Sequence, residues 1–308
     1  MAHATPELSA PTLNDVLVLA RSFDLSLRAR NRSPETIKSY VATVELFGGF
    51  LLVSGFPTSI DRIVREHVES FIADQLARWK PKTARIRYGN LQQFFKWCVE
   101  EGAITDTPMK NVRPPSVPEV PVPIISDDHL RRIFKSVEGT TFVQRRDAAI
   151  LRVLYDCGVR LAEVTGLGVD DVDWDRQVID VVGKGSRPRA VPFGAKTSQV
   201  LHRYLSARQV HLQSGSPALW LGAKGRLTDS GIAQMIRRRC RDAGVPHLHA
   251  HQFRHGAAHR WLASGGSEGD AMRLFGWRSR VMLERYGAVL ADQRAYDAYR
   301  RLCPGDGL

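Results

Sequence analysis

The sequence predicts a mainly helical protein of two domains, of which the second also carries a small antiparallel sheet. The chain has 308 residues, which is above the usual size of a domain with a single core. Apolar residues recur at helical spacing over most of its length. One stretch, residues 113–123, interrupts this pattern with five prolines in eleven residues. Such a stretch cannot continue a helix and favours an extended connector between two domains.

The first domain is expected to span residues 12–112 and to contain four or five helices with short loops. Residues 1–11 are polar and contain proline, which predicts a disordered N-terminus. A helical pattern begins at Leu13, and Ser33-Pro34-Glu35 is typical of a second helix start, with Ser33 as the N-cap. Two further helices are expected, at 65–78 and 81–101.

The second domain is expected to follow a linker at residues 113–124 and to span residues 125–308. Ser126 predicts the cap of a helix that ends near Val137. Two segments alternate like strands around Gly183-Lys184-Gly185-Ser186, which is typical of a hairpin; they are residues 177–182 and 187–193. The other helices expected here cover residues 145–157, 161–167, 196–213, 228–243, 252–264, 268–275, 279–285 and 292–302.

The charge of the chain favours a nucleic acid as its partner. Lys and Arg number 44 against 32 Asp and Glu, which gives a formal net charge of +12, and residues 121–308 carry +10 of it. A basic surface attracts polyanions, although a surface kept basic for solubility alone has the same composition.

No apolar run reaches the ~18 residues of a membrane span, and the N-terminus lacks a signal peptide. We therefore expect a cytoplasmic protein that does not enter a membrane.

Four points in the second domain concentrate side chains that bind phosphate or transfer protons. Each has an ordinary alternative: a helical ion pair, a solvated hairpin lysine, a capping pair or a core tyrosine. Their joint order and spacing favour the functional interpretation. The residues are Arg160 with Glu163, Lys184, His251 with Arg254 and His255, and Trp277 with Tyr286.

In this order the residues resemble the catalytic set of the tyrosine recombinase (phage integrase, Xer-like) family. The motifs are Gly158-x-Arg160-x-x-Glu163, Gly183-Lys184-Gly185, His251-x-x-Arg254-His255, and Gly276-Trp277 with Tyr286 nine residues after Trp277. The resemblance extends to Thr36-x-x-x-Tyr40, Phe47-x-x-Phe50, the proline-rich linker and Val191-Pro192, and covers about residues 12–290. It implies a core-binding, SAM-like first domain and a catalytic second domain.

The resemblance also implies the activity of a site-specific DNA recombinase. Tyr286 would attack the scissile phosphate, form a covalent 3′-phosphotyrosyl bond and free a 5′ hydroxyl. Arg160 and Arg254 would hold the non-bridging oxygens, and Lys184 would protonate the leaving 5′ oxygen. His251 would hydrogen-bond the phosphate and help to take the tyrosine proton, with support from Glu163 and His255. Trp277 stands where many relatives carry histidine, and its indole N–H donates one bond but cannot shuttle a proton.

No cofactor and no metal are expected. Two arginines and a lysine supply the positive charge that a metal would otherwise bring. Four histidines are crowded in the sequence, but no paired carboxylate or cysteine accompanies them; they are His247, His249, His251 and His255. The four cysteines lie far apart and are expected to be reduced thiols; they are Cys98, Cys157, Cys240 and Cys303.

The expected partners are double-stranded DNA with a specific core site and further copies of this chain in a tetramer, with accessory DNA-bending or directionality proteins. DNA contacts are expected from two basic runs, whose alternative is a solvated helix face: Lys80, Lys82, Arg85 and Arg87, and Arg237, Arg238, Arg239 and Arg241. The C-terminal segment 291–302 would dock on a neighbouring protomer or pack on its own domain.

Two other functions remain compatible with the sequence. A type IB topoisomerase uses a similar arginine, lysine and tyrosine set, but the compact helical domain and the His-x-x-Arg-His motif favour the recombinase. A regulator that binds DNA without cutting it has no chemical need for Tyr286 beside Arg160, Lys184 and Arg254. The sequence predicts a bacterial or phage-encoded protein associated with the nucleoid, without indicating whether the event is integration, excision, dimer resolution or transposition.

Overall fold

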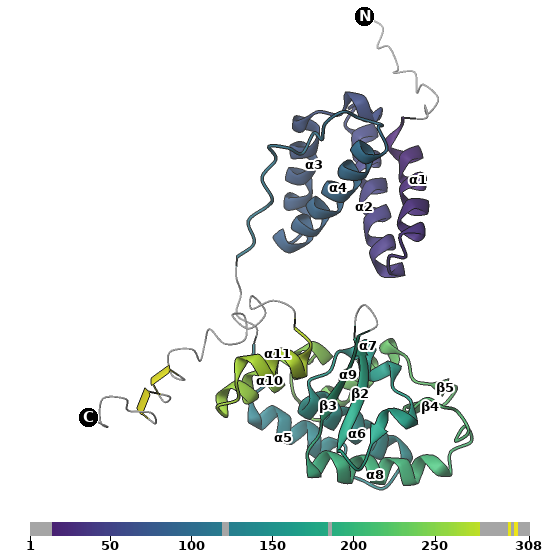
Figure 1. The fold of residues 1–308 in the computed structure, drawn as a ribbon, viewed down its shortest axis with the longest axis vertical. Coiled ribbons are helices and arrows are strands. Elements are labelled where there is room, and N and C mark those ends of the chain that lie inside the picture. Colours follow the sequence, from purple (N-terminus) through teal and green to yellow (C-terminus); the bar gives the residue numbers. More distant parts are fainter. Residues whose placement is uncertain (1–13, 119–122, 184–186, 278–294, 297–298, 301–308) are drawn as a thin grey trace, which may run out of the picture. The chain divides into compact units, whose positions relative to one another are not determined.

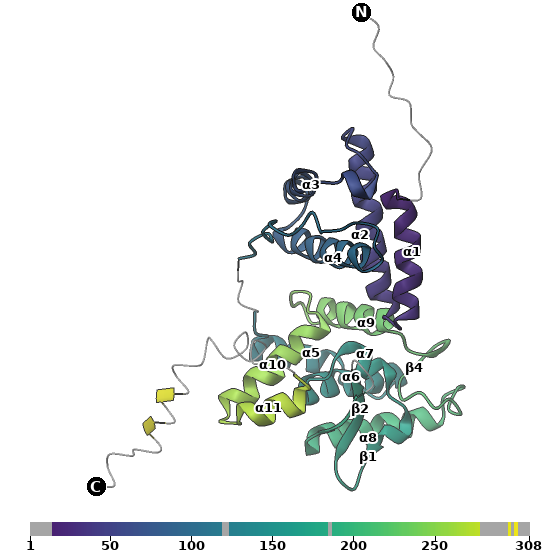
Figure 2. The ribbon, with the colours of Figure 1, turned by 45° about the horizontal axis from the view of Figure 1, so that its top comes forward.

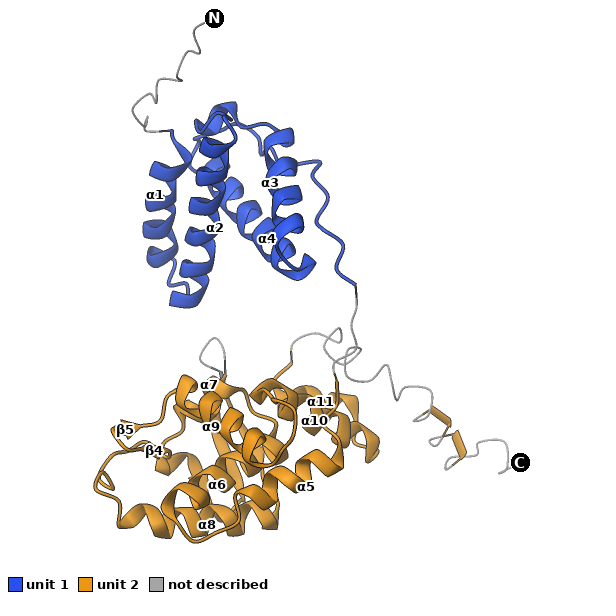
Figure 3. Cartoon of the chain, turned by 180° about the vertical axis from the view of Figure 1, so that it is seen from behind, with its two compact units in different colours: residues 1–119 blue, residues 120–308 orange. Residues whose placement is uncertain are grey.

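The computed structural model describes residues 14–118, 123–183, 187–277, 295–296 and 299–300. The chain forms two compact units, Met1–Glu119 and Val120–Leu308 (Figure 3). The division falls inside the proline-rich segment at residues 113–124 that the sequence predicts as a linker. The predicted disordered stretch 1–11, the predicted helix 279–285 and most of the predicted helix 292–302 lie outside the described residues.

Over its described residues, 14–118, the first unit is a bundle of four α-helices with one short 3-10 turn, Ile60–Arg62 (Figure 1). The predicted start of the second helix is confirmed, because the Ser33 side chain accepts a hydrogen bond from the Thr36 N–H and Pro34 is the first helical residue. Aromatic rings from all four helices fill the core. The helices are α1 Val16–Ala29, α2 Pro34–Val53, α3 Arg65–Arg78 and α4 Pro81–Glu100.

Helix α2 comes closer to a membrane-spanning helix than the sequence analysis expects. It has 20 residues and a mean hydropathy of 1.3, so its length and composition alone would allow it to cross a membrane. Its Val44, Phe47 and Leu51 are nevertheless fully buried in the bundle, where the Phe47 ring meets the rings of Phe71 and Phe95 edge-on. We interpret α2 as the central helix of this core.

The second unit combines helices with a three-stranded antiparallel sheet in the order β1-β2-β3 (Figures 1 and 2). The predicted hairpin is confirmed, with Gly183 paired to Arg187 at the end next to the turn and Ile179 paired to Val191 further along the strands. The elements are α5 Asp127–Ser136, α6 Phe142–Cys157, α7 Leu161–Gly166, β1 Val172–Asp173, β2 Val178–Gly183, β3 Arg187–Pro192, α8 Ala195–Gln209, β4 Leu221–Gly222, β5 Gly225–Arg226, α9 Asp229–Asp242, α10 Ala250–Ala263 and α11 Glu268–Phe275.

Three details of this unit differ from the prediction. Helix α6 begins at Phe142 rather than at residue 145, because Thr141 and Gln144 form a reciprocal cap. Helix α8 ends at Gln209, before the predicted end at residue 213. The strands β1, β4 and β5 have two residues each, too few to show an alternating pattern in the sequence.

Helix α6 forms the centre of the second core. Its Ile150, Leu151 and Leu154 are completely buried, and the helix packs against α8 and α10.

The three cysteines that the structure describes, in the cores of both units, are buried free thiols. Burial raises the pKa of Cys98, in the first unit, to about 12. A thiol with such a pKa stays protonated and unreactive at neutral pH. The core around α6 in the second unit positions the residues at the end of α6 and the start of α7.

Candidate active site

A sharp turn at Gly158 places Arg160 at the start of α7. Gly158 ends α6 with a left-handed backbone at φ 57°. A Cβ at this position would lie 2.5 Å from the Phe275 ring and 2.9 Å from Cβ of Ala257. The turn therefore requires glycine both for its backbone conformation and for the close approach of α10 and α11. Helix α10 carries His251, Arg254 and His255, and Trp277 follows the end of α11.

Glu163 anchors Arg160 through two hydrogen bonds and leaves part of its guanidinium exposed. One carboxylate oxygen of Glu163 accepts the Arg160 backbone N–H at 2.8 Å, and the other accepts Arg160 Nη1 at 2.8 Å. The Glu163 side chain is 4% exposed, whereas that of Arg160 is 40% exposed. The guanidinium of Arg160 is thus fixed in place while much of it still faces solvent, as binding of an anionic ligand requires.

Arg254 joins the turn at Gly158 to the end of α11. It is buried, and its Nη1 donates to the Gly158 carbonyl at 2.7 Å while its Nη2 donates to the Phe275 carbonyl. Its guanidinium lies 5.7 Å from the centre of the Phe275 ring and 5.8 Å from that of Trp277. Because α10 and α11 lie side by side (Figures 1 and 2), these bonds hold Arg254 close to the α6–α7 turn.

The remaining site residues that the structure describes lie around this guanidinium. His251 is exposed in the first turn of α10, and its ring centre lies 4.0 Å from that of buried His255. Trp277 is buried directly after Gly276, the left-handed end of α11, and its ring centre lies 5.1 Å from that of Phe275. Arg160 Nη2 reaches the Gly276 carbonyl at 3.4 Å.

A pocket of about 660 Å³ opens where these elements meet. Among the described residues, six of the lining side chains are arginines or histidines and none is a carboxylate. A concave site lined by cations favours a phosphate group. The lining residues are Val159, Arg160, Leu161, Ser230, Ala233, Gln234, Ile236, Arg237, His247, Leu248, His249, Ala250, His251 and Arg254.

Two predicted catalytic residues, Lys184 and Tyr286, lie outside the described residues. The described part of the hairpin reaches Gly183 and resumes at Arg187. After α11 the described residues break off at Trp277, nine residues before Tyr286, and resume only at residue 295. The structure thus brings together six of the eight predicted site residues: Arg160, Glu163, His251, Arg254, His255 and Trp277.

The sequence analysis missed Arg189, which contacts the same carboxylate as Arg160. Its Nη1 and Nη2 each donate to one Glu163 oxygen at 2.9 Å. Burial alone would raise the pKa of Glu163, but the bonds from Arg189 and Arg160 outweigh this and lower it to about 2. The strand pattern contained a signal, because Arg189 shares a strand face with apolar Val191 and pairs with buried Val181. A charged residue on an apolar face needs a charged partner.

The predicted DNA contacts in the first unit remain on its surface. Lys80, Lys82 and Arg85 are exposed at the start of α4. Arg85 also donates to the Pro115 carbonyl at 2.9 Å. Arg87 is half-buried, with its guanidinium 5.0 Å from the centre of the Trp79 ring. Lys80 and Lys82 are therefore the most accessible members of this run.

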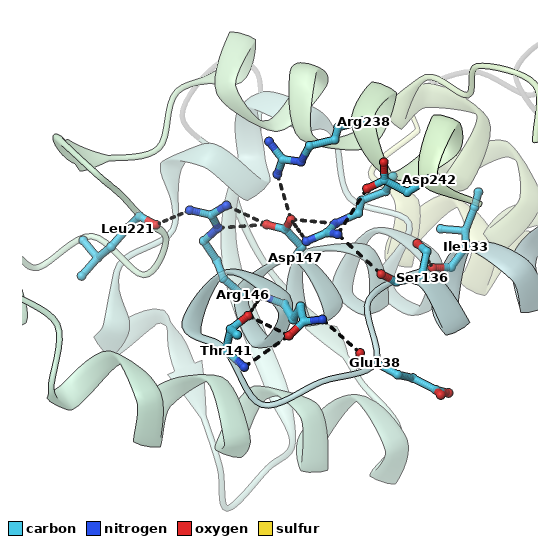
Figure 4. Close-up of polar contacts among 11 residues, drawn as sticks. Ile133, Ser136, Glu138, Thr141, Arg146, Asp147, Leu221, Arg238 and Asp242 are labelled. Carbon is cyan, nitrogen blue, oxygen red and sulfur yellow. Dashed lines mark hydrogen bonds and ion pairs between the residues drawn. The ribbon is translucent and has the colours of Figure 1, made fainter. Parts of the chain in front are cut away.

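The basic run on α9 divides into two faces. Arg237 and Arg241 are exposed, and Arg237 lines the pocket. Arg238 donates to Asp147 at 3.0 Å with 42% of its side chain exposed, as Figure 4 shows. Arg239 is 11% exposed and bonded to Asp147 and Asp242. A helix turns 100° per residue, so four nearly adjacent side chains cannot share one face. We therefore correct the DNA-contact prediction by omitting Arg239.

Comparison with known proteins matches both units to one family. Residues 124–293 match the phage integrase family, and residues 19–103 match the phage integrase N-terminal SAM-like domain. Tyrosine recombinase XerC of Chromobacterium violaceum is 27% identical over 279 residues, which cover 87% of this chain and 89% of that protein. Tyrosine recombinase XerC of Corynebacterium efficiens is 30% identical over 220 residues, which cover 71% and 70%.

Solved structures share the fold. XerH site-specific recombinase, in a post-cleavage complex with palindromic difH substrate, superposes with a TM-score of 0.76 at 18% identity, covering 97% of this chain and 99% of that chain. A lambda integrase tetramer bound to a Holliday junction gives a TM-score of 0.66 at 15% identity, covering 86% and 78%. The predicted mainly helical fold with a small antiparallel sheet is confirmed. The chain belongs to the phage integrase family of tyrosine recombinases.

Proposed function

We propose that this protein is a site-specific DNA recombinase that cleaves and rejoins DNA strands through a covalent 3′-phosphotyrosyl bond to Tyr286. The observation that carries this proposal is the meeting of Arg160 and Arg254 at one cationic pocket, together with His251. The two arginines come from different helices, and hydrogen bonds to Glu163 and to backbone carbonyls hold them there. Family membership supports the same activity.

The pocket suits the charge that develops during phosphoryl transfer. A phosphodiester attacked in line gathers negative charge on its non-bridging oxygens. Two guanidinium groups that are already oriented stabilise this charge without reorganising during the step. Arg160 offers an exposed guanidinium, and Arg254 is held at the base of the pocket by Gly158 and Phe275. The scissile phosphate would therefore bind between them.

The reaction balances with groups of this chain alone. The Tyr286 oxygen forms a bond to phosphorus while the bond from phosphorus to the 5′ oxygen breaks. The tyrosine proton passes to His251, and Lys184 donates a proton to the departing 5′ oxygen. Attack by another strand's 5′ hydroxyl reverses these transfers. Because the phosphotyrosyl bond retains the energy of the phosphodiester, rejoining needs no nucleotide cofactor.

Trp277 would support this chemistry without transferring a proton. It is buried beside Arg254, with its ring 5.8 Å from the guanidinium. An indole N–H is a donor only. Trp277 can thus pack against Arg254 and donate one hydrogen bond to a phosphate oxygen. Among the described residues, His251 is then the site histidine that lines the pocket.

Double-stranded DNA with a specific core site is the proposed substrate, and a tetramer on two sites is the proposed assembly. Solved relatives support both: one is a lambda integrase dimer bound to a core site, and another is a lambda integrase tetramer bound to a Holliday junction. Action on DNA in a bacterial cytoplasm follows from this proposal. The exposed Lys80 and Lys82 would contact DNA phosphates from the first unit.

Covalent trapping tests the proposed activity. The protein is incubated with fragmented genomic DNA of its source, denatured, and the attached DNA is sequenced to identify the site. A nicked duplex of this site, which loses its 5′ hydroxyl fragment after cleavage, then accumulates the adduct. We expect an adduct with the natural protein and none with Tyr286→Phe.

Two experimental outcomes would support one of the alternative functions instead. A protein that protects a specific site from nuclease digestion but forms no adduct on it would be a non-cutting regulator. A protein that relaxes supercoiled plasmids without this site, and does not join two copies of it, would be a topoisomerase. A plasmid that carries two copies of the trapped site distinguishes these activities in one assay.

A further inference from the structure

We propose that Arg189 is a positioning residue of the recombination reaction: through Glu163 it orients the guanidinium of Arg160 toward the scissile phosphate. This inference rests on the proposed function, because it names a further residue that the same pocket requires. Arg189 does not line the pocket. Any effect of Arg189 on the reaction must therefore pass through the groups that it holds.

Glu163 connects the two arginines atom by atom. Its Oε1 accepts Arg189 Nη1 at 2.9 Å and Arg160 Nη1 at 2.8 Å. Its Oε2 accepts Arg189 Nη2 at 2.9 Å and the Arg160 backbone N–H at 2.8 Å. Each carboxylate oxygen thus serves both arginines. Because a bidentate fork fixes the plane of the carboxylate, Arg189 also sets the direction from which Arg160 is held.

The carboxylate at the centre of this chain of contacts is its most buried member. The side chain of Arg160 is 40% exposed, that of Arg189 is 14% exposed and that of Glu163 is 4% exposed. A screened surface pair between Arg160 and Glu163 would orient the guanidinium only loosely. The buried pair between Glu163 and Arg189 is shielded from water, so it restrains the carboxylate more firmly. Arg160 therefore has a rigid support on the side away from the pocket.

Arg189 also connects this support to the turn that leads to Trp277. Its Nε donates to the Leu274 carbonyl at 3.0 Å, while Arg160 Nη2 reaches the Gly276 carbonyl at 3.4 Å. A Cβ on Gly276 would come within 3.3 Å of the Arg189 guanidinium. Arg189 stands on β3, the strand that follows the hairpin with Lys184. One side chain thus links three segments that carry proposed catalytic residues.

The charge of Glu163 depends on this arrangement. Burial opposes ionisation of the carboxyl group and so raises its pKa, and among the groups that lower the pKa again the hydrogen bond from Arg189 comes first. Without Arg189 the carboxylate would keep Arg160 as its charged partner and would draw this guanidinium closer. Arg160 would then turn away from the phosphate, which slows the chemical step more than DNA binding.

Single-turnover cleavage of the nicked suicide duplex tests the proposal. We expect Arg189→Met to form the adduct about 100-fold more slowly than the natural protein, with DNA affinity unchanged within about threefold. Arg189→Lys should recover little of the rate, because an ammonium cannot form the bidentate fork. The control is Arg226→Gln, which removes an arginine that donates to the Thr165 carbonyl at the end of α7. It should cleave at the natural rate.

A second substrate separates positioning from a loss of stability. In a methylphosphonate duplex, a methyl group replaces one non-bridging oxygen of the scissile phosphate and removes its negative charge. If Arg189 acts by aiming the charge of Arg160, the natural protein and Arg189→Met should differ by less than about threefold on this duplex. A variant that is merely unstable would lose the same factor on both substrates, and that result would overturn the proposal.

Arg189 and Glu163 should also act as one unit in the cleavage reaction. Arg189→Met combined with Glu163→Gln should be no slower than the slower single variant, whereas a multiplied loss would mean independent roles and contradict the proposal. If the natural protein forms the adduct and Arg189→Met matches its rate, only the role of Arg189 is wrong. If the natural protein forms no adduct at the site that it protects, the proposed function fails as well.

Discussion

The Nη2 atom of Arg239 lies 2.8 Å from a carboxylate oxygen of Asp147, which is completely buried. Asp147 also accepts two bonds from Arg146 and one from Arg238, as the close-up in Figure 4 shows. Arg146 in turn donates to the Leu221 carbonyl at 2.9 Å. One carboxylate of α6 thus gathers three arginines and connects this helix to α9, the helix that brings Arg237 to the pocket.

Removing the charge of Asp147 should destabilise the second unit strongly. Asp147→Asn removes the buried carboxylate that pairs with the largely buried guanidinium groups of Arg146 and Arg239. Loss of one partner from a buried ion pair lowers the free energy of unfolding by about 3–5 kcal/mol. Urea unfolding measures this loss. Asp242→Asn is the control, because this partner of Arg239 is 37% exposed, and it should lower the free energy of unfolding by less than about 1 kcal/mol. Similar values for both variants would contradict the prediction.

The two faces of α9 should respond differently to salt. Arg237→Gln should weaken DNA binding and lower the slope of log affinity against log salt by about 1, because one phosphate contact is lost. Arg239→Met on the same helix should leave the slope unchanged and lower the stability instead, because its partners are Asp147 and Asp242. Binding titrations at several salt concentrations compare the two. A reduced slope for Arg239→Met would return this residue to the DNA surface.

The ion pairs of Glu163 should stabilise the fold only where this group is ionised. Its pKa is about 2 in the folded protein against an ordinary 4.5. A carboxyl group with a lowered folded pKa contributes stability that is fully present above its unfolded pKa and is lost as the pH falls through its folded pKa. The natural protein should therefore exceed Glu163→Gln in stability above pH 4.5, and the difference should shrink between pH 4.5 and about 2. Unfolding curves across this range measure it, and a constant difference would contradict the lowered pKa.

Gly158 should not tolerate a side chain. Gly158→Ala forces a left-handed backbone on alanine and places its Cβ 2.5 Å from the Phe275 ring. The strained backbone alone should lower the free energy of unfolding by about 1–3 kcal/mol, and displacement of α11 should also slow adduct formation. Gly166→Ala is the control in the same unit, because a Cβ there meets nothing within 4 Å. It should change the free energy of unfolding by less than about 0.5 kcal/mol. Equal effects of the two substitutions would contradict this account of the turn.

Local patterns in the sequence were enough to predict most of the described helices and the hairpin. Ser33-Pro34 predicts a helix start because a hydroxyl cap and a fixed proline φ act within one turn. The hairpin follows in the same way from two alternating segments around a glycine-containing turn. Such signals involve residues only a few positions apart, so no knowledge of the remaining chain is needed.

Only the tertiary structure decided which charged residues face the pocket and which are buried. Arg237 and Arg239 look alike in the basic run, yet the first lines the pocket and the second is buried against Asp147. Arg189 stands 26 positions after its partner Glu163, and packing of β2 against α7 and of β3 against α11 brings the two together. The role of a guanidinium depends on whether it pairs with a carboxylate or faces solvent. Partners distant in sequence come together only once the core has formed.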